Sequence, residues 1–269
     1  MTHIVVDPLT NNVGAEVRGV NMARGLTDDD RCALAEAFKA YGLLVMHDLD
    51  IDVDQQITLA RTFGTPVLRE KNQTQDTNRR TQHVSNVLPD GVFGAGELDF
   101  HMDQLFWPDP LKALMLYGIE IPSEGGDTKF VDTAKVYARM PQQLRDKIDG
   151  LHCRHAYTFA GNLAKEWRVK DAETQNMEVE HPIVWRDPDG PRVGLWVNKL
   201  TTVGVVGLQD EEGAELIASI RDRLYDDTAT YTHRWRPGDL VLWNNHTFQH
   251  ARMPFDAGQR RTLRRTTLM

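Results

Sequence analysis

The sequence has little of what marks secreted or membrane proteins. Only two cysteines occur among 269 residues, Cys32 and Cys153, and they match no ligand spacing, so we expect neither a disulfide framework nor a cysteine-rich metal site. No apolar run approaches the roughly 20 residues that a transmembrane helix needs. The first residues, MTHIVVDPLT, lack a basic segment followed by an apolar core. We therefore expect a cytoplasmic protein without membrane contact.

The chain also lacks an excess of positive charge. It holds 31 Lys and Arg against 39 Asp and Glu, a net charge of −8, which argues against nucleic acid as a partner. The exception is the closing segment RRTLRRTTLM, with four arginines at 260, 261, 264 and 265. Thr, Leu and Met are mixed among these arginines, which is more typical of a strand than of a disordered basic arm.

No repeat, low-complexity tract or Pro/Gly/Ser-rich linker divides the chain, so we expect a single domain over residues 1–269. Capping signals predict helices from Thr27 to Gly42 and from Asp52 to Gly64, and helical patterns fit 134–149 and 209–225. Most of the rest consists of short strands between polar turns, including 111–121, 127–131, 239–243, 247–252 and 261–268. Many strands and few helices favour a sandwich or barrel. The polar, irregular segment 159–180 is a candidate lid over a site.

The segment FHMDQLFW places His101 and Asp103 two residues apart. Side chains with that spacing share one face of a strand, so both can reach one metal ion. This pattern is common by chance and is weak evidence alone. His250, in the strand-rich segment LVLWNNHTFQHAR, can supply a third ligand from a distant strand. Two histidines and one carboxylate leave three coordination positions open, an arrangement typical of non-haem Fe(II) oxygenases.

Two further residues fit a bound acid beside that metal. Arg261 follows His250 closely enough to reach the same cavity from the next strand, where its guanidinium can pair with a carboxylate. Thr128 follows the tight glycine turn of EGGDTKF, and its hydroxyl can join that arginine.

This set of residues, with the segments DQQITLARTFG, SNVLPDG, RWRPGDLVLWNNHTFQH and RRTLRRTTL, resembles the taurine dioxygenase / 2,4-dichlorophenoxyacetate dioxygenase (TauD/TfdA) family over nearly the whole chain. The resemblance implies a mainly β fold, a double-stranded β-helix (a cupin-like jelly roll) with flanking helices. It implies His101, Asp103 and His250 as ligands of Fe(II). Arg261 would hold the distal carboxylate of 2-oxoglutarate, with Thr128 beside it. The enzyme would consume O2, release succinate and CO2, and hydroxylate its substrate.

The resemblance also bears on the substrate. Arg265 matches the position that meets the substrate's anionic group in related enzymes. We expect a small organic anion, most often a carboxylate, with an apolar or aromatic body beside Phe100, Phe106 and Trp107. For Phe106 core packing is the alternative role, and it needs a strand irregularity to reach a pocket. Glu97 is a candidate contact for a substrate hydroxyl or amine, or an exposed loop carboxylate. Arg260 and Arg264 are interpreted as a solvated strand edge.

Two departures from the family pattern stand out. The usual W-D-N-R reads Trp243-Asn244-Asn245-His246 here, and Phe100 replaces a common Trp. His246 is an alternative metal ligand, although a structural role is favoured.

Other functions stay open from the sequence alone. Desaturation, cyclisation or taurine/alkylsulfonate-type oxidation would use the same cofactors. A zinc hydrolase would not need Arg261 and Thr128 for a keto acid. The intact candidate ligands argue against a non-catalytic binding protein. We also expect a homo-oligomer.

Overall fold

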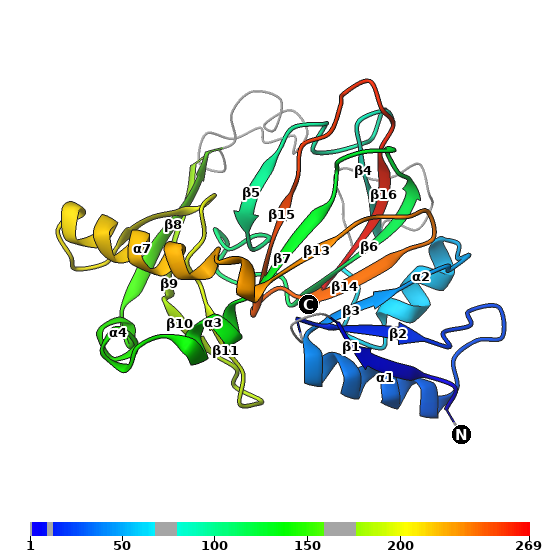
Figure 1. Cartoon of the computed structure of the whole chain (residues 1–269), viewed down its shortest axis with the longest axis horizontal. Coiled ribbons are helices and arrows are strands. Elements are labelled where there is room, and N and C mark those ends of the chain that lie inside the picture. The colour runs from blue at the N-terminus through cyan, green and yellow to red at the C-terminus, as the bar shows by residue number, and fades with distance from the viewer. Residues whose placement is uncertain (1, 10–12, 68–79, 159–175) are drawn as a thin grey trace.

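Two β-sheets face each other in the computed structural model, which describes residues 2–9, 13–67, 80–158 and 176–269 (Figure 1). The large sheet has the strand order β1-β2-β3-β14-β6-β16-β4, and the smaller has the order β13-β7-β15-β5. The strands of these two sheets are β1 (Val5–Pro8), β2 (Ala15–Arg18), β3 (Leu43–Met46), β4 (Thr81–Ser85), β5 (Leu98–His101), β6 (Ala113–Glu120), β7 (Thr128–Asp132), β13 (Thr230–His233), β14 (Leu240–Asn244), β15 (Phe248–Arg252) and β16 (Thr262–Leu268).

Alternation of side chains along the strands creates a core on each face of the large sheet. In β3, Leu43 and Val45 pack between the two sheets with Phe130 and Trp243. The intervening Leu44 and Met46 face the opposite way, against helices α1 (Asp28–Tyr41) and α2 (Val53–Ala60). A strand buried on both faces needs apolar residues at every position, which explains the unbroken run LLVM.

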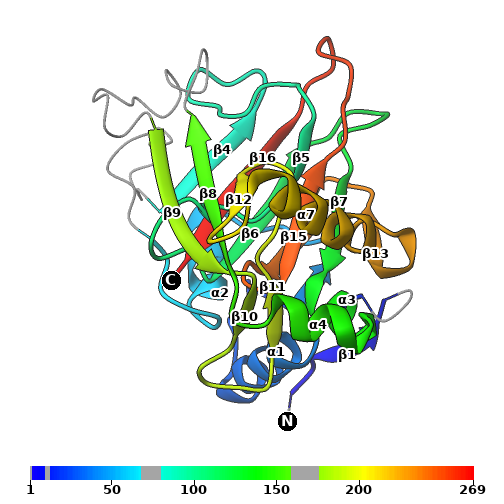
Figure 2. The same cartoon turned by 90° about the vertical axis from the view of Figure 1, so that its left-hand side faces the viewer.

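A second group of elements packs against the smaller sheet (Figures 1 and 2). It contains helices α3 (Thr133–Arg139), α4 (Gln142–Ile148) and α7 (Asp210–Leu224), and the short helix η2 (Asp227–Ala229). A three-stranded sheet is formed by β12 (Thr202–Val205), β8 (His152–Thr158) and β9 (Asn176–Pro182), and a two-stranded sheet by β10 (Val184–Arg186) and β11 (Val193–Leu195). The arrangement as a whole is the predicted double-stranded β-helix with helices outside. Within the described ranges no helix has the length and apolar character to cross a membrane.

The capping predictions are confirmed at helix starts. Thr27 forms a reciprocal capping box with Asp30, and Gly42 ends α1 with a φ of 71°. Asp52 and Gln55 form the box of α2, but that helix ends at Ala60, before Gly64. The single helix expected at 134–149 is wrong. Pro141 disfavours a helical conformation in the residue before it, and Met140 is extended with a ψ of 144°, so α3 and α4 are separate.

Strand β16 is not a solvated edge, because it lies between β6 and β4. Arg264 is buried on its outer face, where Nε donates to Gln56 Oε1 at 2.6 Å. The expectation of a solvated Arg264 is therefore wrong. Arg260 is exposed, as expected, and pairs with Glu120 at 2.9 Å. Most of the candidate lid, residues 159–175, lies outside the described residues, and its last residues belong to β9.

His155 in β8 predicts how stability depends on pH. The ring is fully buried, with Nδ1 3.2 Å from Thr201 Oγ1, and burial lowers the pKa of His155 to about 3. Above pH 6.5 the ring is neutral in both states. As pH falls below that value only the unfolded state takes up the proton, so the free energy of unfolding falls by up to about 1.4 kcal/mol per pH unit. The free energy of unfolding, measured with denaturant at several pH values between 7 and 5, should change less with pH in His155→Gln than in the wild type. The same substitution at the exposed His152 should leave the slope unchanged, and an equal slope in His155→Gln contradicts the assignment.

Candidate active site

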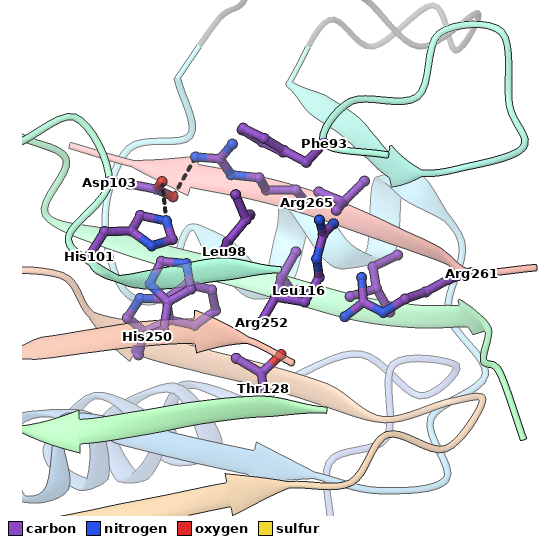
Figure 3. Close-up of a pocket in the computed structure, with 13 residues that line it drawn as sticks. Phe93, Leu98, His101, Asp103, Leu116, Thr128, His250, Arg252, Arg261 and Arg265 are labelled. Atoms are coloured by element: carbon purple, nitrogen blue, oxygen red, sulfur yellow. Dashed lines mark hydrogen bonds and ion pairs between the residues drawn. The ribbon is translucent and has the colours of Figure 1, made fainter. Parts of the chain in front are cut away.

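Three metal-competent side chains meet between the sheets (Figure 3). His101 ends β5, and the register of β5 with β15 sets His250 directly opposite it. Their ring centroids are 4.2 Å apart, and His101 Nε2 lies 3.5 Å from Asp103 Oδ1. One ligand atom from each of the three residues lies within 4.8 Å of the others, so a single ion can be coordinated by all of them.

Asp103 reaches this point in a different way from the one predicted. Strand β5 stops at His101, and Asp103 lies in the following turn, where Gln104 has a φ of 62°. The side chain of Asn245 fixes the turn from the opposite side. Its Oδ1 accepts from the Asp103 amide at 2.9 Å, and its Nδ2 donates to the Asp103 carbonyl at 2.9 Å. The expectation of one shared strand face is wrong, although the two side chains lie close together.

The protonation states of the three side chains suit a divalent metal. The Asp99 carbonyl lies 2.7 Å from His101 Nδ1 and can only accept, so Nδ1 carries the proton and Nε2 is left for an ion. Burial, reinforced by the neighbouring His101, holds the pKa of His250 well below its ordinary value. Burial opposes ionisation of Asp103, yet Arg265 and His101 hold its pKa well below the usual range. Two imidazoles and a carboxylate fit Fe(II).

His246 does not join these ligands. It lies in the turn between β14 and β15, where its ring packs 4.7 Å from Trp185 and its Nε2 lies 3.4 Å from the Pro110 carbonyl. This agrees with the structural role favoured for it.

Arg261 and Thr128 line the same cavity as the three candidate ligands. Arg261 is buried, and its Nε and Nη2 donate to the Gly126 carbonyl at 3.2 and 3.0 Å. Gly126 has a φ of 71°, and a Cβ added to it would lie only 3.0 Å from Arg261 Nε. Both the backbone conformation and the close contact therefore favour glycine at this position. Burial, with Arg252 nearby, lowers the pKa of Arg261 to about 9, which still leaves a cation at neutral pH.

Arg265 also points into the cavity, and it already has an anionic partner. Its Nη2 lies 2.5 Å from Asp103 Oδ2, and its guanidinium lies 5.8 Å from the Phe93 ring centre. The substrate-binding role expected for Arg265 stays a prediction, because the carboxylate of a candidate metal ligand already pairs with it.

Sequence reasoning missed Arg252, which also lines the cavity. It follows His250 by two residues on β15 and donates to the carbonyls of Gly94, at 3.0 Å, and Gly96. Residues two apart on a strand share a face, so the position of Arg252 relative to the candidate ligand His250 could have predicted that it faces the cavity. Arg252 ties the loop before β5 to the smaller sheet.

A second lobe of the cavity shares Phe93, Leu98, His101 and Asp103 with the first, and its lining also includes the aromatic residues Phe106 and Tyr157. Phe106 stacks on Tyr157 there with ring centres 4.9 Å apart, and the turn after β5 is the irregularity that it needs. Phe93 and Tyr157 were not predicted. Phe100 instead stacks on Tyr225 at 4.6 Å, and Trp107 is 37% exposed, so neither forms the expected wall. Glu97 is exposed and lines neither lobe, so its substrate contact stays a prediction.

Comparison with known proteins gives the class of this site. Residues 6–267 match the model of the family described as "Taurine catabolism dioxygenase TauD, TfdA family". The chain belongs to this family. It is a 2-oxoglutarate-dependent non-haem iron dioxygenase that uses Fe(II), 2-oxoglutarate and O2.

The relatives have different substrates. The chain is 28% identical to (S)-phenoxypropionate/alpha-ketoglutarate-dioxygenase of Sphingobium herbicidovorans, covering 96% of this chain and 92% of the relative. It is 28% identical to alpha-ketoglutarate-dependent 2,4-dichlorophenoxyacetate dioxygenase of Cupriavidus pinatubonensis (99% and 98%). It is 29% identical to alpha-ketoglutarate-dependent sulfate ester dioxygenase of Pseudomonas putida (98% and 88%). The solved structure of AAD-2 with Mn(II) and N-oxalylglycine has a TM-score of 0.81 at 24% identity, covering 100% of this chain and 97% of that one.

The choice between His250 and His246 is testable. His250→Gln should lose the weak visible absorption band that a keto acid gives on Fe(II) in anaerobic solution, because it removes one of three ligands. His246→Gln is the matched control and should keep the band. The reverse result would move the third ligand to His246.

Proposed function

We propose that this enzyme hydroxylates a small carboxylate with an apolar or aromatic body. The observation that carries the proposal is the division of the cavity into two lobes beside one metal site. Arg261 and Thr128 line one lobe, Phe106 and Tyr157 line the other, and Phe93 lines both. Arg265 lines the first lobe and lies beside Asp103, which lines both lobes (Figure 3).

In this proposal His101, Asp103 and His250 hold the iron. Bound Fe(II), with 2-oxoglutarate and O2, supplies the chemistry that yields succinate, CO2 and a hydroxylated product. The distal carboxylate of 2-oxoglutarate pairs with Arg261 and accepts from the Thr128 hydroxyl. Burial of both residues keeps water away from that pair and strengthens it.

Arg265 positions both a ligand and the substrate. Its contact with Asp103 Oδ2 leaves Oδ1, the oxygen nearer His101, for the metal. A guanidinium has five N–H donors, and the contacts with Asp103 and Gln82 leave others for a substrate anion. The substrate's body then lies against Phe93, Phe106 and Tyr157, which holds its reacting carbon beside the metal.

The aryloxy-acid relatives support a carboxylate with an aromatic body. The sulfate ester relative supports the same cationic anchor with a different anion. A cytoplasmic location, a homo-oligomer, a single domain and a lid near residues 159–180 stay predictions.

Arg261→Ala tests the co-substrate lobe. It should weaken binding of 2-oxoglutarate by about 2–5 kcal/mol, because it removes a charge-assisted pair from a buried site. Binding of the primary substrate should change far less. Titration of the anaerobic Fe(II) enzyme measures the first, and substrate-dependent oxygen uptake at saturating 2-oxoglutarate measures the second. Arg260→Ala, next in sequence but exposed, is the control. Unchanged 2-oxoglutarate binding in Arg261→Ala would show that the lobe is wrongly assigned.

Arg265 tests the substrate class. A screen of aryloxy and other apolar acids by oxygen uptake identifies the best substrate, and its neutral amide serves as the comparison. The wild type should prefer the acid strongly, Arg265→Lys should keep much of that preference, and Arg265→Gln should lose most of it. The ratio of acid to amide rates cancels any general loss from disturbing Asp103. Equal rates for acid and amide in the wild type would show that Arg265 does not bind a substrate anion. A preference for sulfate esters over carboxylic acids would show that the substrate's anionic group is a sulfate.

A further inference from the structure

An indole lies directly behind Thr128. Trp235 follows β13, and its Nε1 donates to Thr128 Oγ1 at 2.9 Å. Both side chains are buried, but only Thr128 faces the cavity. The pairing of β13 with β7 sets His233 opposite Thr128, and the His233 ring contacts the indole edge-on at 4.5 Å. The indole is therefore fixed in orientation by its neighbours.

This contact restricts what the Thr128 hydroxyl can do. An indole nitrogen is a donor only, whereas a hydroxyl has one hydrogen and two acceptor lone pairs. Thr128 Oγ1 must accept from Trp235, so its own hydrogen is left for another partner. Accepting one hydrogen bond also polarises the O–H group and strengthens it as a donor.

We propose that Trp235 is a positioning residue that makes Thr128 a dedicated donor to the distal carboxylate of 2-oxoglutarate. The inference rests on the proposed assignment of Thr128 and Arg261 to the co-substrate lobe. Arg261 supplies the charge, and the pair Trp235–Thr128 supplies a neutral donor of fixed direction. Without the indole, the hydroxyl hydrogen can occupy several staggered positions, and fewer of them point at the anion.

The test compares two keto acids that share the metal-binding end. Pyruvate has the keto-carboxylate but no distal carboxylate, so it cannot use Thr128. Dissociation constants come from anaerobic titration of the Fe(II) enzyme with 2-oxoglutarate and with pyruvate. Trp235→Phe and Thr128→Val should each weaken 2-oxoglutarate about fivefold, as expected for one neutral hydrogen bond, and leave pyruvate within about twofold. The double variant should bind 2-oxoglutarate no more weakly than Thr128→Val, because the indole acts through the hydroxyl.

Trp196→Phe is the matched control. It loses an indole hydrogen bond of the same length, 2.9 Å to the His246 carbonyl, remote from Thr128, so its ratio of the two constants should equal that of the wild type. If Trp235→Phe does not fold, benzothienylalanine at position 235 keeps the ring shape and replaces the N–H with sulfur.

Four outcomes would overturn the inference. Equal weakening of both keto acids in Trp235→Phe would reduce the indole to packing. Multiplicative losses in the double variant would show that Trp235 acts independently of the hydroxyl. If 2-oxoglutarate binding is normal in Trp235→Phe but weakened in Thr128→Val, the role of Trp235 is wrong and the proposed co-substrate lobe stands. If binding is normal in Thr128→Val, the proposed lobe is wrong as well.

Discussion

The pairing of β15 with β5 is the constraint on which the site depends. It sets His250 opposite His101, and the same strand pairs on its other side with β7, which brings Thr128 opposite Arg252. A shift of one residue in this register would turn His250 out of the cavity and into a packed layer, because side chains alternate along a strand. The register is held by burial on both faces, since Phe248 and Ala251 of β15 are buried. The convergence of His101 and His250 therefore depends on the same packing that keeps the two sheets together.

Local signals predicted the parts of the fold that depend on local chemistry. The capping box at Thr27 and the left-handed Gly42 define α1 because each acts within one helical turn. The set of candidate ligands and Arg261 could also be read from residue types and order. The conformation of Asp103 could not be predicted, because it depends on hydrogen bonds with the side chain of Asn245, a residue far away in the chain. Phe93 and Tyr157 were missed because the segments around them have no sequence pattern that indicates a position near a metal site.

Arginine placement shows how position in the sheet overrides composition. The four arginines near the C-terminus have the same side chain and three different environments. Arg260 pairs with a glutamate at the surface, Arg264 is hydrogen-bonded beneath α2, and Arg261 and Arg265 face the cavity. A central strand has two buried faces, so its arginines must find carbonyl, amide or carboxylate partners on both. The sequence alone suggested an edge strand, where those partners would have been water.

The balance of charge in the cavity favours anionic ligands over neutral ones. Arg252, Arg261 and Arg265 line it with one carboxylate, Asp103. Arg252 donates to the backbone carbonyls of Gly94 and Gly96. Burial weakens solvent screening, so each buried guanidinium costs free energy that a bound anion would reduce. The lowered pKa of Arg261 is the direct sign of that cost. In the proposed function the metal would share Asp103 with Arg265, and the Arg265 guanidinium would keep less of its negative partner. Metal binding would thereby leave more of the Arg265 charge available to the anionic group of the substrate.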